Sequence, residues 1–119
     1  MTVLLVEDEL FIRMDLEQRI RNVGIDIVGT SATGHEAVQL AKKHKPDVIL
    51  MDIKLKGDMD GIEAANEITT YLPCNIVFIS AFEKQDLEGI LTNSKCNIRY
   101  YPKPITDENL QKIFSEFGS

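Results

Sequence analysis

The sequence predicts an α/β fold in which five parallel strands form one sheet with helices on both of its faces. Five short apolar runs recur along the chain, and none shows the polar–apolar alternation of a half-exposed strand. Segments with helical periodicity lie between the runs. This alternating order of strands and helices favours right-handed crossovers, which place successive strands parallel to one another.

The strands are predicted from the apolar runs themselves. We expect each strand to be buried on both faces, as is usual in a parallel sheet that helices cover. The five runs, in chain order, are Val3–Val6, Ile25–Val28, Val48–Met51, Ile76–Ile79 and Ile98–Tyr101.

The helices are predicted from apolar residues spaced three or four positions apart, which form one face of a helix packed against a core. The first of these stripes is closed by Val23 before Gly24, and the fourth is weaker because Gly89 interrupts it. The stripes, in chain order, are Ile12, Leu16, Ile20 and Val23; Ala37, Val38 and Ala41; Ile62, Ala65 and Ile68; Leu87, Ile90 and Leu91; and Leu110, Ile113, Phe114 and Phe117.

Length and charge limit the classes of function. We expect residues 1–119 to form one domain, and 13 basic against 19 acidic residues give a net charge of −6. An acidic chain argues against direct nucleic-acid binding and is compatible with a cation site or a protein partner. The chain has no apolar run of about eighteen residues and its start lacks a basic signal-peptide segment, so we expect no membrane insertion and a cytoplasmic location.

The two cysteines, Cys74 and Cys96, lie in neither a CxxC nor a Cys/His spacing. The sequence therefore favours neither a zinc site nor a redox pair. We expect two reduced and mostly buried thiols.

Polar side chains follow four of the five apolar runs. In an open parallel sheet the binding crevice lies at the carboxyl ends of the strands, so these residues are expected to share one crevice. They are Glu7, Asp8, Asp52, Ser80 and Lys103. Two carboxylates about 4 Å apart repel by about 4 kcal/mol at an effective dielectric of 20, so the cluster needs a cation or the lysine. A set of oxygen ligands without His or Cys suits Mg²⁺.

Each of these residues also has a simpler interpretation. Glu7 and Asp8 are the kind of acids that stabilise a helix N-terminus, and Ser80 is a common helix cap. Five such residues at the same predicted end of one sheet nevertheless favour a functional site.

Four segments, in order, resemble the receiver domain of two-component response regulators, to which the chemotaxis receiver CheY belongs. They are LLVEDE, PDVILMDIKLKGDMDGIEAA, VFISA and RYYPKP, and the resemblance covers essentially the whole chain. It implies a flavodoxin-like (βα)5 fold with strand order 2-1-3-4-5. It also implies a signalling domain rather than an enzyme, with its own autophosphorylation and autodephosphorylation chemistry, and no output domain in this chain.

The resemblance assigns Asp52 as the phosphoacceptor, which takes a phosphoryl group from the phosphohistidine of a sensor kinase or phosphotransfer protein. Mg²⁺, or Mn²⁺ in its place, would be held by Glu7, Asp8, Asp52 and the main-chain carbonyl of Lys54. These roles fit phosphoryl transfer, in which catalysis is mostly positioning and electrostatics.

The resemblance also implies how the signal is passed on. Lys103, followed by Pro104 after a cis peptide bond, and Ser80 would contact phosphoryl oxygens. Tyr100 would move inward when Ser80 shifts. The output face would combine the fourth helix, the fifth strand and the fifth helix, and two copies could pair through the same face as a homodimer.

The sequence departs from the family pattern beside the phosphoacceptor. Lys56-Gly57 stands where proline is common, and the loop before Asp60-Gly61 is one residue longer. Lys54 and Phe82 occupy positions that, in the family, tune dephosphorylation and access to the phosphoryl group. We expect Asp58 and Asp60 to serve this loop and the start of the third helix. Two further replacements keep the functional group: Ser80 stands where threonine is frequent, and Glu7 where aspartate is frequent.

Rival interpretations fit the residues less well. An EF-hand that uses Asp58, Asp60 and Gly61 would place Lys56 at the first ligand position, where a carboxylate is needed. A haloacid-dehalogenase-type, Mg²⁺-dependent phosphatase needs a second aspartate two residues after Asp52, where Lys54 stands. A flavodoxin-like FMN site needs a phosphate loop after the first strand, where Glu7-Asp8 would repel phosphate. Within the family, the alternative is a phosphorylation-independent interaction module.

Overall fold

Five parallel strands form one sheet in the order β2-β1-β3-β4-β5 in the computed structural model, which describes residues 1–81 and 96–117. The strands are β1 (Thr2–Val6), β2 (Asp26–Ser31), β3 (Val48–Asp52), β4 (Asn75–Ser80) and β5 (Asn97–Pro102). The helices within the described ranges are α1 (Leu10–Asn22), α2 (Gly34–His44), α3 (Gly61–Tyr71) and α4 (Asp107–Phe117). The predicted fold class and strand order are therefore confirmed.

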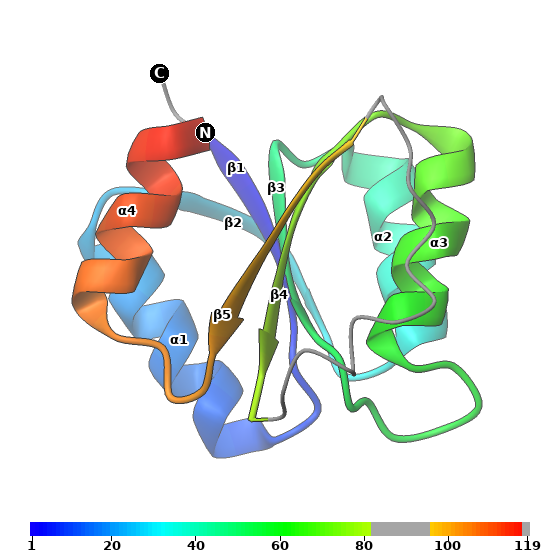
Figure 1. The fold of residues 1–119 in the computed structure, drawn as a ribbon, viewed down its shortest axis with the longest axis horizontal. Coiled ribbons are helices and arrows are strands. Elements are labelled where there is room, and N and C mark those ends of the chain that lie inside the picture. The colour runs from blue at the N-terminus through cyan, green and yellow to red at the C-terminus, as the bar shows by residue number, and fades with distance from the viewer. Residues whose placement is uncertain (82–95, 118–119) are drawn as a thin grey trace.

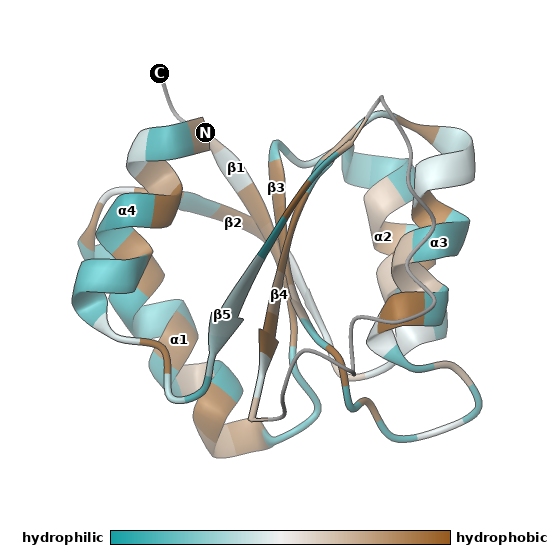
Figure 2. Ribbon diagram, viewed as in Figure 1, coloured by the Kyte–Doolittle hydropathy of each residue, from teal (hydrophilic) through white to brown (hydrophobic). Residues whose placement is uncertain are grey.

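The helices cover the sheet in two layers (Figure 1). Helices α1 and α4 lie on one face, and α2 and α3 lie on the other. Alternate residues of β1, β3 and β4 point to opposite faces of the sheet. Each layer of helices therefore buries its own apolar cluster. Figure 2 shows the apolar character of β3 and of the inward sides of the helices. No helix in residues 1–81 or 96–117 has the length and apolar character to cross a membrane.

One predicted helix lies outside the described residues. The stripe Leu87, Ile90 and Leu91 falls there, so α4 in Figure 1 is the helix predicted from Leu110 to Phe117. Of the expected output and dimerisation face, the described residues therefore include the strand β5 and the last helix, α4.

Two expectations about burial are wrong. Strands β2 and β5 are not buried on both faces, because they form the two edges of the sheet and most of their residues stay partly exposed. Val23 does not close the buried face of α1: it follows the helix as its C-cap and is 43% exposed. Leu16 and Ile20 alone provide the fully buried part of that stripe.

Candidate functional site

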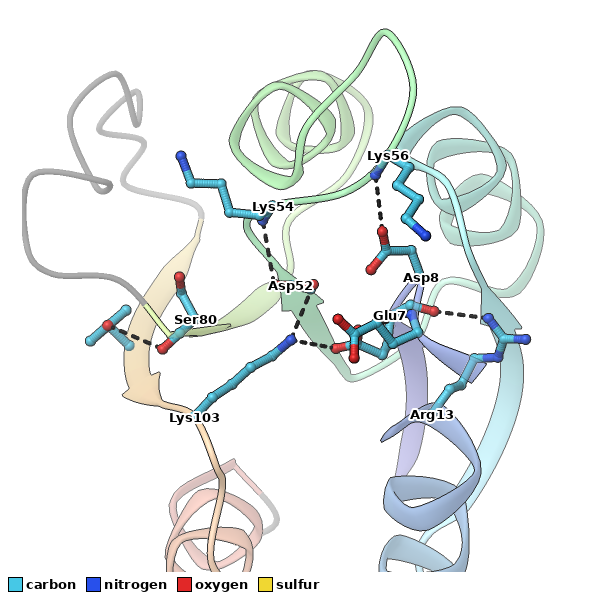
Figure 3. Close-up of polar contacts among 10 residues, drawn as sticks. Glu7, Asp8, Arg13, Asp52, Lys54, Lys56, Ser80 and Lys103 are labelled. Carbon is cyan, nitrogen blue, oxygen red and sulfur yellow. Dashed lines mark hydrogen bonds and ion pairs between the residues drawn. The ribbon is translucent and has the colours of Figure 1, made fainter. Parts of the chain in front are cut away.

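The predicted site residues lie together at one end of the sheet, at the carboxyl ends of four strands (Figure 3). Asp52 and Ser80 are the last residues of β3 and β4, and Lys103 directly follows β5. Glu7 and Asp8 directly follow β1. Because β1, β3 and β4 are neighbours in the sheet, their ends are adjacent although the residues are far apart in the sequence.

The buried strand β3 and the start of α3 together fix the position of Asp52. Val48–Met51 are fully buried, and Asp52 is only 5% exposed. The N–H of Gly61 donates to the carbonyl of Ile53 at 2.8 Å, which draws the start of α3 against the end of β3. A Cβ atom at Gly61 would collide with the carbonyl oxygen of Asp52, so only glycine permits this close approach.

Asp60 serves the start of α3, as the sequence predicts. Its carboxylate accepts a hydrogen bond from the N–H of Glu63 at 2.8 Å, and the Glu63 carboxylate accepts one from the N–H of Asp60 at 3.4 Å. This reciprocal arrangement is a capping box, which satisfies two otherwise unpaired backbone donors. Asp60 is thereby assigned to the helix and not to the acidic cluster.

Lys103 bridges two of the acidic residues. Its Nζ lies 2.9 Å from Glu7 Oε2 and 3.2 Å from Asp52 Oδ2, and its side chain is 19% exposed. The Lys103 N–H donates to the carbonyl of Ser80 at 2.8 Å, which extends the β4–β5 pairing past the strand ends. The Lys103–Pro104 peptide bond is cis, as expected from the resemblance.

Burial decides the direction of the pKa shift of the two carboxylates, whereas their contacts decide that of Lys103. It raises the pKa of Glu7, which is 2% exposed, and outweighs the opposing hydrogen bond from Lys103. Burial likewise raises the pKa of Asp52, although the positive charge of Lys103 opposes that shift. For Lys103, burial alone would lower the pKa, but its contacts with Glu7 and Asp52 give a net increase. The lysine therefore stays charged, while both carboxylates are costly to keep ionised.

The acidic cluster fits a divalent cation. Glu7, Asp8 and Asp52 each offer a carboxylate oxygen, and these oxygens all lie within 4.8 Å of one another. Three ionised carboxylates and the Lys103 ammonium leave two negative charges, which a divalent cation would balance. Oxygen ligands are also those that Mg²⁺ prefers. Lys54 contributes a backbone N–H that donates to Asp52 Oδ1 at 3.3 Å, and the role of its carbonyl as a ligand stays a prediction.

The loop after β3 contacts the acidic cluster in a way that sequence reasoning missed. The backbone N–H of Lys56 donates to Asp8 Oδ2 at 3.2 Å (Figure 3). Leu55 anchors the loop because its side chain is buried in the core cluster, and Gly57 allows the chain to turn at φ +99°. Proline is common at this place in the family and has no N–H to donate. Its replacement by Lys56 was therefore the one feature of the sequence that could have indicated this hydrogen bond.

The remaining predicted residues lie around this centre. Ser80 is fully buried, and its main-chain carbonyl accepts a hydrogen bond from the hydroxyl of Tyr100 at 3.4 Å. The side chain of Lys54 points away from the Asp52 carboxylate in Figure 3. Phe82 lies outside the described residues.

Two cavities meet at Lys103. A cleft of about 590 Å³ lies over the acidic cluster and is bordered by Asp8, Asp52 and Lys103. A cavity of about 520 Å³ lies between α1 and the segment that follows β5, with Phe11 and Ile105 in its lining. Phe11 is 83% exposed, and sequence reasoning did not single it out because an apolar segment at a helix start is equally typical of residues that pack into the core.

Comparisons with known proteins place the chain among its relatives. A family model described as the response regulator receiver domain matches residues 3–115. The transcriptional regulatory protein PdtaR of Mycobacterium tuberculosis is 48% identical over 85 residues, which are 71% of this chain and 41% of that protein. The phyllosphere-induced regulator PhyR of Methylorubrum extorquens is 35% identical over 115 residues, which are 96% of this chain and 42% of that protein.

A solved structure gives the same result. A chain in the crystal structure of the CheX-CheY-BeF3-Mg²⁺ complex from Borrelia burgdorferi has a TM-score of 0.82 and is 29% identical; the match covers 98% of this chain and 88% of that chain. The chain described here thus spans about two-fifths of the two curated relatives, and most of that solved receiver chain.

Proposed function

The chain belongs to the response regulator receiver domain family of two-component signalling, and from this premise we propose that it is a Mg²⁺-dependent phosphoacceptor with Asp52 as the nucleophile. The observation that carries the proposal is the contact of Lys103 Nζ with both Asp52 and Glu7, beside the Asp8 carboxylate and at the floor of a cleft. The test is the mass of the intact chain after incubation with Mg²⁺ and a small acyl phosphate, with a chelator as control. We expect one added phosphoryl group with Mg²⁺ and none with the chelator.

In the proposed reaction, an oxygen of the Asp52 carboxylate attacks the phosphorus of a phosphohistidine. A new O–P bond forms as the P–N bond breaks, and the electron pair of that bond returns to the histidine nitrogen. Glu7, Asp8, Asp52 and the Lys54 carbonyl would hold the metal. When bound, Mg²⁺ supplies positive charge that offsets the negative charge of the transferring group.

Lys103 and Ser80 would stabilise the product. The Lys103 ammonium already lies within 3.2 Å of Asp52 Oδ2, so it can follow the added charge to a phosphoryl oxygen with a small movement. The Ser80 hydroxyl would donate to another phosphoryl oxygen. The hydroxyl of Tyr100 contacts the Ser80 backbone at 3.4 Å. When Ser80 shifts, Tyr100 would move with it and so change the surface at β5.

Energies indicate that Ser80 cannot drive this switch by itself. A change from 1:99 to 99:1 between two states requires about 5.5 kcal/mol of differential stabilisation. One neutral hydrogen bond contributes about 1 kcal/mol net. The Lys103 contact, the metal and the repacking of Tyr100 would have to supply the remainder.

Asp8→Asn is expected to remove the stabilisation by Mg²⁺. At a Mg²⁺ concentration of about 100 times its Kd, binding to the native state adds about 2.7 kcal/mol, or roughly 10 °C in Tm for a domain of this size. Asp8 is the least buried of the three acidic ligands, so its replacement disturbs packing least. Thermal melts with and without Mg²⁺ measure the difference, and Asp58→Asn is a matched control in the nearby loop. An equal Mg²⁺-dependent rise in Asp8→Asn and wild type would contradict the metal assignment.

The phosphodonor is proposed to dock beside Lys103, over the cavity that Phe11 and Ile105 line. Leu10, Phe11 and Met14 are more than half exposed near the start of α1, and Phe11 lines this cavity. Aromatic residues at the centre of an interface commonly account for much of its binding energy. A histidine kinase or phosphotransfer protein seated here would bring its phosphohistidine close to Asp52.

Phe11→Ala is therefore expected to slow phosphotransfer from a phosphorylated donor protein about tenfold at limiting donor concentration, which corresponds to about 1.4 kcal/mol. The rate with a small acyl phosphate should not change, because that donor does not need the docking surface. Val23→Ala, at the other end of the same helix and also exposed, is the control. An equal loss with both donors would mean that Phe11 acts on the site or the fold and not on docking.

A further inference from the structure

The two cysteines lie side by side at the end of the sheet opposite the acidic cluster. Cys74 precedes β4 and Cys96 precedes β5, and their Sγ atoms are 3.7 Å apart. The N–H of Asn97 donates to the carbonyl of Cys74 at 3.2 Å, so the pairing of the two strands already holds these positions together. Cys74 is buried, whereas Cys96 is only partly buried.

The register of the two strands explains why the thiols meet. Asn75 pairs with Asn97, Ile76 with Ile98 and Phe78 with Tyr100, so the cysteines occupy the preceding step of the same ladder. Cys74, Ile76 and Phe78 belong to the core cluster beneath α2 and α3, and Cys96 and Tyr100 pack against that cluster. Both thiols therefore point to the same face of the sheet.

We infer that Cys74 and Cys96 are an oxidation site at which a peroxide forms an intramolecular disulfide. Neighbouring strands lie about 4.8 Å apart, which falls within the Cα separation of about 4.4–6.8 Å that disulfides span. The sulfur atoms must approach from 3.7 Å to a bond length of about 2.05 Å, a change that side-chain rotation can provide.

The difference in burial assigns a separate role to each thiol. The Cys96 thiolate, partly exposed, attacks one peroxide oxygen, the O–O bond breaks, and a sulfenic acid and hydroxide form. The Cys74 sulfur then attacks the Cys96 sulfur, the S–O bond breaks, and the leaving hydroxide takes the Cys74 proton. Together, two thiols and one hydrogen peroxide give one disulfide and two water molecules. Burial raises the pKa of Cys74 to about 12, so its thiol stays protonated near neutral pH and Cys96 is the thiol assigned to the reaction with peroxide.

Both cysteines are free in the structure, in agreement with the expectation of two reduced and mostly buried thiols, and the inference concerns what a peroxide does to them. Sequence spacing gave no signal, because 21 residues separate the cysteines and only the β4–β5 register brings them into contact. The inference does not depend on the proposed phosphorylation, since no acidic residue or phosphodonor takes part. The alternative is that the two thiols pack together and stay reduced.

The test uses the whole chain, treated with hydrogen peroxide and then with a thiol alkylating agent. We expect the mass of the monomer to fall by two hydrogen atoms, no alkylation, and a rise in Tm of about 5–10 °C that dithiothreitol reverses. Cys74→Ser and Cys96→Ser should each prevent the mass loss and the rise in Tm, and Cys96→Ser should also prevent formation of the sulfenic acid.

Other results would overturn the inference. These are alkylation of both cysteines after peroxide treatment, a disulfide found only between two copies of the chain, or oxidation that stops at a sulfenic or higher acid in the wild type. If Cys74→Ser fails to fold, Cys96→Ser and the tryptic map of the oxidised wild type, in which a peptide containing Cys74 is linked to one containing Cys96, still decide the question.

Discussion

Asp52→Asn is expected to abolish phosphorylation of the chain by Mg²⁺ and a small acyl phosphate. An amide oxygen is a far weaker nucleophile than a carboxylate. Within residues 1–81 and 96–117, no other carboxylate has the same surroundings: the end of a buried strand, a lysine at 3.2 Å and two acidic neighbours. We expect labelling to fall at least a hundredfold, as is usual when the nucleophile of a covalent reaction is removed. Intact mass measures the extent of labelling. A label that is stable to acid and removed by hydroxylamine is an acyl phosphate.

The fold should survive this replacement. Asparagine has nearly the same shape as aspartate, and its introduction removes one of the carboxylates that burial makes costly to ionise. Lys103 keeps its contact with Glu7 Oε2 at 2.9 Å. The unlabelled variant should therefore melt at or above the Tm of the wild type without Mg²⁺.

Asp58→Asn is the matched control, because Asp58 lies in the same acidic segment but is exposed and outside the acidic cluster. It should be labelled at the wild-type rate. Undiminished labelling of Asp52→Asn would place the phosphoryl group elsewhere, with Glu7 and Asp8 as the first residues to examine. Loss of labelling in both variants would indicate that the loop, and not the nucleophile, limits the reaction.

The sheet could be predicted from the sequence because its strands are short apolar runs and its helices carry regular stripes. The inner strands β1, β3 and β4 match those runs closely. The edge strands do differ in composition, since Ile25–Val28 contains Asp26 and Ile98–Tyr101 contains Arg99, whereas the three inner runs contain no charged residue. Which strands lie at the edge depends on strand order, and the resemblance supplied that order.

The site residues could be predicted as types at strand ends, but their contacts could not. That Lys103 reaches both Glu7 and Asp52 depends on how far β5 extends before the cis peptide bond. The hydrogen bond from the Lys56 N–H to Asp8 is made by the backbone, which a pattern of side chains does not reveal. The contact between Cys74 and Cys96 depends on the register of two strands.

Lys103→Ala is expected to slow phosphorylation about a hundredfold and to destabilise the metal-free protein by about 3 kcal/mol. The first value is typical for loss of one charged donor at a reacting centre, about 3 kcal/mol of transition-state stabilisation. The second is the lower end for breaking a buried ion pair, because the Lys103 side chain keeps some exposure. The measurements are the rate of labelling by a small acyl phosphate and urea unfolding without Mg²⁺, with the exposed Lys43→Ala as control.

The pH dependence separates an electrostatic role of Lys103 from simple packing. Burial already raises the pKa of Glu7 and Asp52, and loss of the ammonium should raise both further. The folded state of Lys103→Ala then binds more protons than the unfolded state, so its free energy of unfolding increases as the pH falls from neutrality toward the ordinary carboxyl pKa of about 4. The destabilisation relative to wild type should be largest near neutral pH and shrink toward about pH 5, and Mg²⁺ should reduce it at pH 7 by neutralising the same carboxylates. A destabilisation that is equal at both pH values and insensitive to Mg²⁺ would assign Lys103 to packing alone.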